Sequence, residues 1–210
     1  MGFRRILVVI AMMIATLPVA QAAFQVGVLG GLAVTGASLS TGLSTNTLQS
    51  SSKASFKIGF SGEYDVMPNL ISVEMNLLYS KYQWEQSTTG ITLASEVSTS
   101  WWELPIFVNY TGIEWFKFGL GPVFDFATGS VHTENPDGTS PVDRSYSAAG
   151  LGSTSVGIGF QAGFTYPVSA PWTINADMRY VLGLTNLSQV SPASTNLHSF
   201  DFLVGVGYAL

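Results

Sequence analysis

The chain has 210 residues, of which 47% are hydrophobic and only 10% are charged, and it contains no cysteine. An average soluble domain has about a quarter of its residues charged, so this chain has too little charge for an ordinary water-facing surface. The lack of cysteine excludes disulfides, thiolate metal sites and a lipid-modified N-terminal cysteine.

The N-terminus has the pattern of a secretory signal peptide. A short cationic start precedes an apolar run over residues 6–17, which is too short to span a bilayer. Ala20 and Ala22 flank one spacer residue, the small-x-small pattern that signal peptidase recognises. We predict cleavage after Ala22, with a signal peptide over residues 1–22 and one outer-membrane β-barrel domain over residues 23–210.

Removal of the signal peptide also removes two arginines. The mature chain then carries six Lys and Arg against thirteen Asp and Glu, a formal net charge of −7. This acidic balance argues against nucleic acid as a partner.

Eight stretches of the mature sequence alternate with period two. One set of alternate positions, or parity, holds large apolar residues, and the other parity holds small or polar residues. In the clearest stretch, Phe56, Ile58 and Phe60 alternate with Lys57 and Gly59, a pattern that no helix would use. We predict eight strands over residues 24–34, 55–66, 71–84, 101–110, 116–126, 155–166, 172–183 and 200–210.

The third predicted strand changes its alternation after Tyr79. Its large residues then fall at Tyr82 and Trp84, on the other parity. This shift predicts a β-bulge in the third strand.

The connections between these stretches alternate in length. Short turns follow the second, fourth and sixth strands. Long segments rich in Ser, Thr, Asn and Gly follow the first, third, fifth and seventh, over about residues 35–53, 85–98, 128–154 and 185–197. Short periplasmic turns and long outer loops are typical of outer-membrane barrels, so we expect an all-β, eight-stranded antiparallel up-and-down transmembrane β-barrel.

The volume of such a barrel decides which parity faces outward. Eight strands enclose an interior that side chains just fill, and roughly forty large residues could not all enter it. We therefore expect the large residues to face lipid and the polar parity to face the lumen. Buried charges must pair or reach water, so we predict interior ion pairs among Lys57, Glu63, Glu74, Glu103, Lys117, Asp125, Asp177, Arg179 and Asp201.

Aromatic residues near the strand ends are expected to form two girdles at the membrane surfaces, because amphipathic rings settle at the level of the lipid headgroups. The predicted girdle residues are Tyr64, Tyr79, Trp84, Trp102, Tyr110, Trp172, Tyr180 and Tyr208.

Two short motifs resemble a known family. The fourth strand contains Glu103-Leu104-Pro105, and the fifth contains Gly119-Leu120-Gly121-Pro122. This pair resembles the Glu-Leu-Pro and Gly-x-Gly-Pro motifs of the small outer-membrane β-barrel domain family, which includes PorT-like proteins. The arrangement of strands and loops extends the resemblance over nearly the whole mature chain. This arrangement also resembles that of OmpA-like eight-stranded barrels.

The resemblance implies a location in the outer membrane of a Gram-negative-type envelope. It also implies insertion by the barrel assembly machinery into outer-membrane lipid, and we expect a monomer. The chain ends in Leu210, whereas the assembly signal of such barrels usually ends in an aromatic residue.

Catalytic and metal motifs are sparse. The two histidines are His132, in a long predicted loop, and His198, beside Ser199 near the start of the last strand. Neighbouring strand residues point to opposite faces, so His198 would not activate Ser199. We therefore expect no enzyme activity, no metal and no cofactor.

Three functions remain open at this point. The first is a structural or surface-interaction role for the Ser/Thr-rich loops, the second a narrow porin-like channel for small solutes, and the third a lipid-modifying enzyme.

Overall fold

The computed structural model describes residues 24–40, 48–88, 94–134, 140–190 and 192–210. The predicted cleavage site, at Ala20 and Ala22, lies outside these residues. In the described residues the strands are β1 (Phe24–Ser40), β2 (Leu48–Met67), β3 (Ile71–Thr88), β4 (Ala94–Ile113), β5 (Phe116–Glu134), β6 (Val142–Arg144), β7 (Thr154–Ser169), β8 (Trp172–Gly183) and β9 (Ser194–Ala209).

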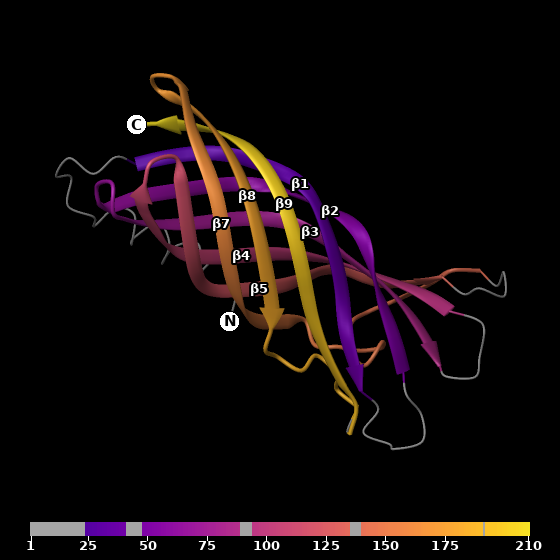
Figure 1. Cartoon of the computed structure of the whole chain (residues 1–210). Helices are drawn as coiled ribbons and strands as arrows, with labels where there is room; N and C mark the ends of the chain where they lie inside the picture. The colour runs from indigo at the N-terminus through magenta and orange to yellow at the C-terminus, as the bar shows by residue number, and fades with distance from the viewer. Residues whose placement is uncertain (1–23, 41–47, 89–93, 135–139, 191) are drawn as a thin grey trace.

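Eight of these strands close into a ring. Each of the long strands pairs antiparallel with its neighbours in the order β1, β2, β3, β4, β5, β7, β8 and β9, and β9 pairs back to β1. The short strand β6 pairs with β5 alone. The predicted eight-stranded antiparallel barrel is therefore confirmed (Figure 1).

The large apolar parity faces outward, as the volume argument predicts. On β2, Ile58 and Phe60 are 58% and 65% exposed, whereas the intervening Lys57 is 1% exposed. The same alternation follows β9, where Phe202 and Val204 are exposed and Asp201 and Leu203 are buried. An exposed apolar band thus surrounds an interior that contains the buried charged residues.

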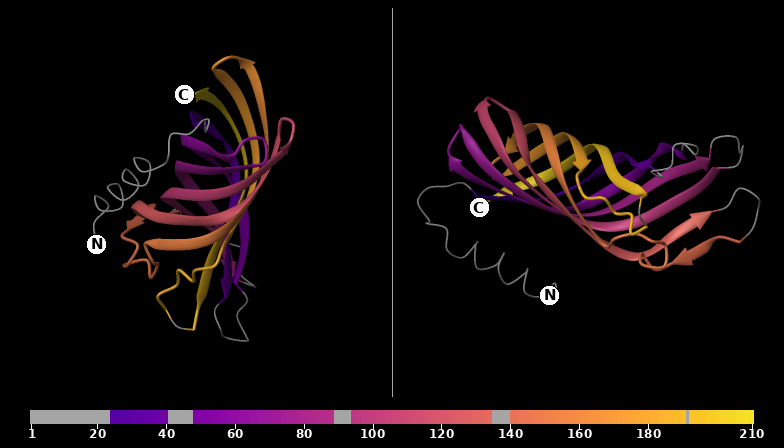
Figure 2. Two further views of the ribbon diagram at one scale, coloured as in Figure 1. Left: turned by 90° about the vertical axis from the view of Figure 1, so that its left-hand side faces the viewer. Right: turned by 90° about the horizontal axis from the view of Figure 1, so that it is seen from below.

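The two ends of the barrel differ. Figure 1 shows the start of β1 and the C-terminus at one end, which we call the turn end, and the far ends of β1, β3 and β5 at the other, which we call the loop end. Figure 2 shows how the strands tilt around the barrel. Within the described residues, no helix is long and apolar enough to span a membrane.

The strands extend much further towards the loop end than predicted. β1 and β9 remain paired out to Ser40 and Ser194, and β3 and β4 out to Ser87 and Ala94. The prediction of long loops over residues 35–53 and 85–98 is therefore wrong for residues 35–40, 48–53, 85–88 and 94–98, which form strands, and its remainder lies outside the described residues. Ser and Thr in these segments keep an extended backbone because the inward side chains between them, such as Ala37 and Val97, pack in a core.

The predicted bulge also lies on a different strand. β3 keeps one alternation through residues 72–84, and both Tyr82 and Trp84 are buried inside the barrel. The two register shifts of the β2–β3 pair fall instead on β2, between Ser52 and Lys57 and between Asp65 and Met67. Trp84, 3% exposed, is therefore not part of an aromatic girdle.

Two tight turns use backbone conformations that most residues avoid. Asn69, between β2 and β3, and Trp115, between β4 and β5, have φ values of 59° and 68°. Asn adopts this region readily, whereas Trp does so rarely. The ring of Trp115 packs edge-on against Tyr166 at 5.8 Å and Phe164 at 6.5 Å, and these contacts hold the turn in place.

Candidate functional site

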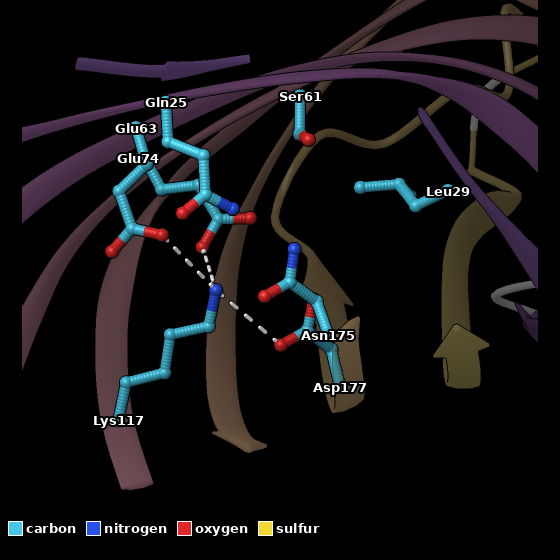
Figure 3. A pocket seen from close by; sticks show the side chains of 8 residues that line it. All are labelled: Gln25, Leu29, Ser61, Glu63, Glu74, Lys117, Asn175 and Asp177. Atoms are coloured by element: carbon cyan, nitrogen blue, oxygen red, sulfur yellow. Dashed lines mark hydrogen bonds and ion pairs between the residues drawn. The ribbon is translucent and has the colours of Figure 1, made fainter. Parts of the chain in front are cut away.

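The lumen near the turn end is crossed by a cluster of charged side chains. This turn-end cluster consists of Glu63, Glu74, Lys117, Asp177 and Arg179 from four strands. Lys117 Nζ lies 2.7 Å from Glu74 and 3.5 Å from both Glu63 and Asp177 (Figure 3). Arg179 lies 2.8 Å from Glu74 and 3.0 Å from Asp177.

Glu74 is the centre of this cluster. Besides the two cations, its carboxylate accepts hydrogen bonds from the amide groups of Asn76 at 3.0 Å, Asn109 at 3.2 Å and Gln161 at 2.7 Å. A buried carboxylate needs such partners, since an unpaired buried charge costs several kcal/mol. The charge on Glu74 is thus compensated by five donors from around the ring.

A second charged group, the loop-end cluster, lies further along the lumen. Lys57 Nζ contacts Glu103 at 2.8 Å and Asp201 at 2.9 Å, and it donates to Ser199 at 3.1 Å. Asp125 lies opposite Glu103 in the β4–β5 register and is 2% exposed, but it forms no ion pair with another described residue. The structure therefore divides the predicted interior charges into two groups and leaves Asp125 outside the ion pairs.

Phe107 separates the two clusters along β4 and fills the lumen. Its ring is fully buried and lies 5.3 Å from the guanidinium carbon of Arg179. A Cβ atom on Gly159 would collide with this ring, and one on Gly121 would collide with the backbone of β4. The motif residues Gly119 and Gly121 thus leave room for the side chain of Asn109 and for the β4 backbone at Ile106, a role that a short sequence motif does not reveal.

An apolar core closes the lumen at the loop end. We call it the outer plug, and its buried members are Ala37, Tyr82, Trp84, Val97, Trp101, Val131, Tyr146, Leu187 and Leu197.

Tyr146 brings a connecting segment into this plug. It lies between β6 and β7, packs edge-on against Trp101 at 5.4 Å, and donates a hydrogen bond to the carbonyl of Ser100 at 3.0 Å. Sequence reasoning assigned Tyr146 to a long polar loop. The only signal for its burial was an isolated aromatic residue in that loop.

Two cavities lie along the lumen of the described barrel. A cavity of about 10 Å³ lies beside Lys117 and Glu74, which is room for about one water molecule. A larger hollow of about 220 Å³ lies at the turn end, lined by Asp65, Trp115 and Thr165 among others. The turn-end cluster lies at the inner side of this hollow, because Glu63 and Lys117 also line it.

The two histidines lie apart from the lumen charges. His132 on β5 bonds Asp143 of β6 at 2.8 Å, and its other ring nitrogen lies 3.4 Å from Glu134. Ser199, the residue after His198, is buried in the lumen. This agrees with the expectation that Ser199 and His198 point to opposite faces of the strand. His198 Nε2 instead lies 3.3 Å from Ser52 Oγ, a pair that sequence reasoning missed because the two residues are far apart in the chain.

The sequence matches the outer membrane protein beta-barrel domain family over residues 19–189. No curated protein matches it. Among solved structures, the fold is similar to Neisserial surface protein A, with 17% identity, 90% of this chain and 99% of that chain covered, and a TM-score of 0.46. It is also similar to OprG from Pseudomonas aeruginosa (14% identity, 90% and 96% covered, TM-score 0.46) and to the outer membrane protease OmpT from Escherichia coli (10% identity, 90% and 97% covered, TM-score 0.46). The chain belongs to the outer membrane protein beta-barrel domain family and is a β-barrel of the outer membrane.

Proposed function

We propose that this protein is a non-conducting barrel that presents a rigid surface outside the membrane for interaction with its surroundings. The observation that carries the proposal is the filled lumen. Lys57, Phe107 and Arg179 are each 2% exposed or less, and the outer plug covers the loop end. An eight-stranded barrel has no further room for a solute path once its interior is filled.

The extended strands support the second half of this proposal. The loop end of an outer-membrane barrel faces the outside of the cell. Here the paired strands and the outer plug form a packed extension rather than four separate long loops. A packed surface loses little conformational entropy on binding, which favours recognition.

The alternative functions have less support. The two charged clusters and the plug oppose a narrow pore. The Ser52–His198 contact has no carboxylate partner for His198 among the described residues, so we propose that the protein is not an enzyme. We further propose a monomer that is inserted by the barrel assembly machinery, with outer-membrane lipid and not nucleic acid as its surroundings.

Conductance across a planar bilayer tests the proposal. Purified protein, shown to be folded by a gel shift on boiling, should give no current steps, while a porin inserted under the same conditions gives them. Reproducible steps that scale with voltage would show an open lumen.

The surface role needs its own measurement. Val190 is 62% exposed at the loop end, so Val190→Asp changes the outer surface and leaves the lumen intact. Cells that produce the wild-type barrel should adhere to protein-coated surfaces better than cells with this variant. Equal adherence of both, and of cells without the protein, would count against an interaction role.

A further inference from the structure

Lys81 lies on the outward face of β3, where the apolar band ends. Tyr79 is the outward residue before it on β3, and Gln83 is the one after it. Lys81 is half-buried and forms no ion pair with any residue in the described part of the chain. An unpaired ammonium group therefore lies at the edge of the membrane band towards the loop end.

Three other residues lie beside Lys81 on the outward face of β3 and β4. In the β3–β4 register Lys81 lies opposite Ser100, and Tyr79 lies opposite Trp102. The Tyr79 hydroxyl donates to Ser100 Oγ at 3.0 Å, and the Tyr79 and Trp102 rings meet edge-on at 5.6 Å. Side chains opposite each other or two residues apart on neighbouring strands are within about 8 Å. These four residues therefore form one compact patch, which we call the Lys81 patch.

Lys53, the other lysine near this edge, already has carboxylate partners. Lys53 on β2 lies 2.5 Å from Glu85 and 3.4 Å from Glu96, so its charge is already compensated. The three lumen cations are likewise held by carboxylates. Lys81 thus combines a free positive charge with a position at the level of the lipid headgroups.

We propose that the Lys81 patch binds the phosphate group of a glycolipid in the outer leaflet of the outer membrane. The ammonium group supplies the charge, and the hydroxyl of Ser100 supplies a hydrogen-bond donor at the same height. The rings of Tyr79 and Trp102 lie one row deeper, where they contact the start of the acyl chains. The surface chemistry of the patch therefore changes from apolar to cationic over one step along the strand, which complements a lipid that changes from an apolar acyl chain to an anionic phosphate group.

Native mass spectrometry of the folded barrel with added lipid A tests this proposal. A lysine near a membrane surface contributes about 1 kcal/mol to binding of anionic lipid, which corresponds to about a fivefold change in affinity. We expect Lys81→Gln to bind phosphorylated lipid A about fivefold more weakly than the wild type, whereas Lys81→Arg retains the affinity.

Lys53→Gln is the matched control because it removes a nearby lysine that is already paired with carboxylates. It should bind like the wild type, and dephosphorylated lipid A should bind equally to all variants. Each variant is first shown to be folded by its gel shift. The proposal is wrong if Lys81→Gln binds as tightly as the wild type, if Lys53→Gln loses as much, or if the loss persists with dephosphorylated lipid.

Discussion

Replacement of Glu74 by Gln should strongly destabilise the barrel. Glu74→Gln keeps the shape of the side chain but removes the charge that compensates Lys117 at 2.7 Å and Arg179 at 2.8 Å. It also replaces a carboxylate oxygen, which accepts a hydrogen bond from the amide of Gln161, with an amide NH2 group, which can only donate. Breaking a buried ion pair while its partners remain typically costs about 3–5 kcal/mol. We expect a loss of this size in the free energy of unfolding.

The assay is urea unfolding of the barrel in lipid vesicles, followed by the gel shift and by tryptophan fluorescence. Glu63→Gln is the matched control, because this carboxylate lies 3.5 Å from Lys117 and its side chain is 16% exposed. A weaker, partly exposed pair contributes about 1 kcal/mol or less. If Glu74→Gln and Glu63→Gln lower the unfolding free energy equally, the turn-end cluster does not have the structure described above.

Other predictions concern the lumen filler and the loop end. Phe107→Ala should lower the unfolding free energy by about 3–5 kcal/mol, because a fully buried ring is lost and the neighbouring Gly121 and Gly159 cannot fill the space. The same urea assay checks this prediction. A loss in the unfolding free energy below about 1 kcal/mol would contradict it. The hydrogen bond to Asp143 raises the pKa of His132, so the β5–β6 contact should be fully stabilising below the unfolded-state pKa of about 6.5 and should weaken as pH rises through the higher folded-state pKa. An NMR titration should show this raised pKa, and Asp143→Asn should bring it down; an unchanged pKa in that variant would refute the assignment.

Period-two alternation predicted the barrel because it is a local property of the chain. Residues 55–66 and 200–210 show it so clearly that strand number, pairing and the outward face follow from it and from the small interior volume. The charged residues lie on the polar parity. Because the small interior volume turns the large residues outward, the charged residues face the lumen. Their division into two clusters could not be predicted, because it depends on strand tilt and register.

The errors arose where the interior becomes apolar. Tyr82 and Trp84 look like outward residues when the lumen is assumed to be polar. This assumption produced the false bulge in β3 and the wrong assignment of Trp84 to a girdle. The outer plug is built from five strands and from the two connecting segments that contain Tyr146 and Leu187, so no single stretch of sequence shows it. The Ser/Thr-rich segments were predicted as loops because composition alone does not show that their alternate residues pack in that plug.

Trp101 and Trp102 provide the most direct test of the barrel's inside and outside. These neighbours are 1% and 37% exposed and point to opposite faces of β4. Two variants, each with one of them as its only tryptophan and the others replaced by Phe, can be folded into vesicles that contain brominated lipid. We predict strong quenching of Trp102 fluorescence and little quenching of Trp101. Equal quenching, or stronger quenching of Trp101, would contradict it.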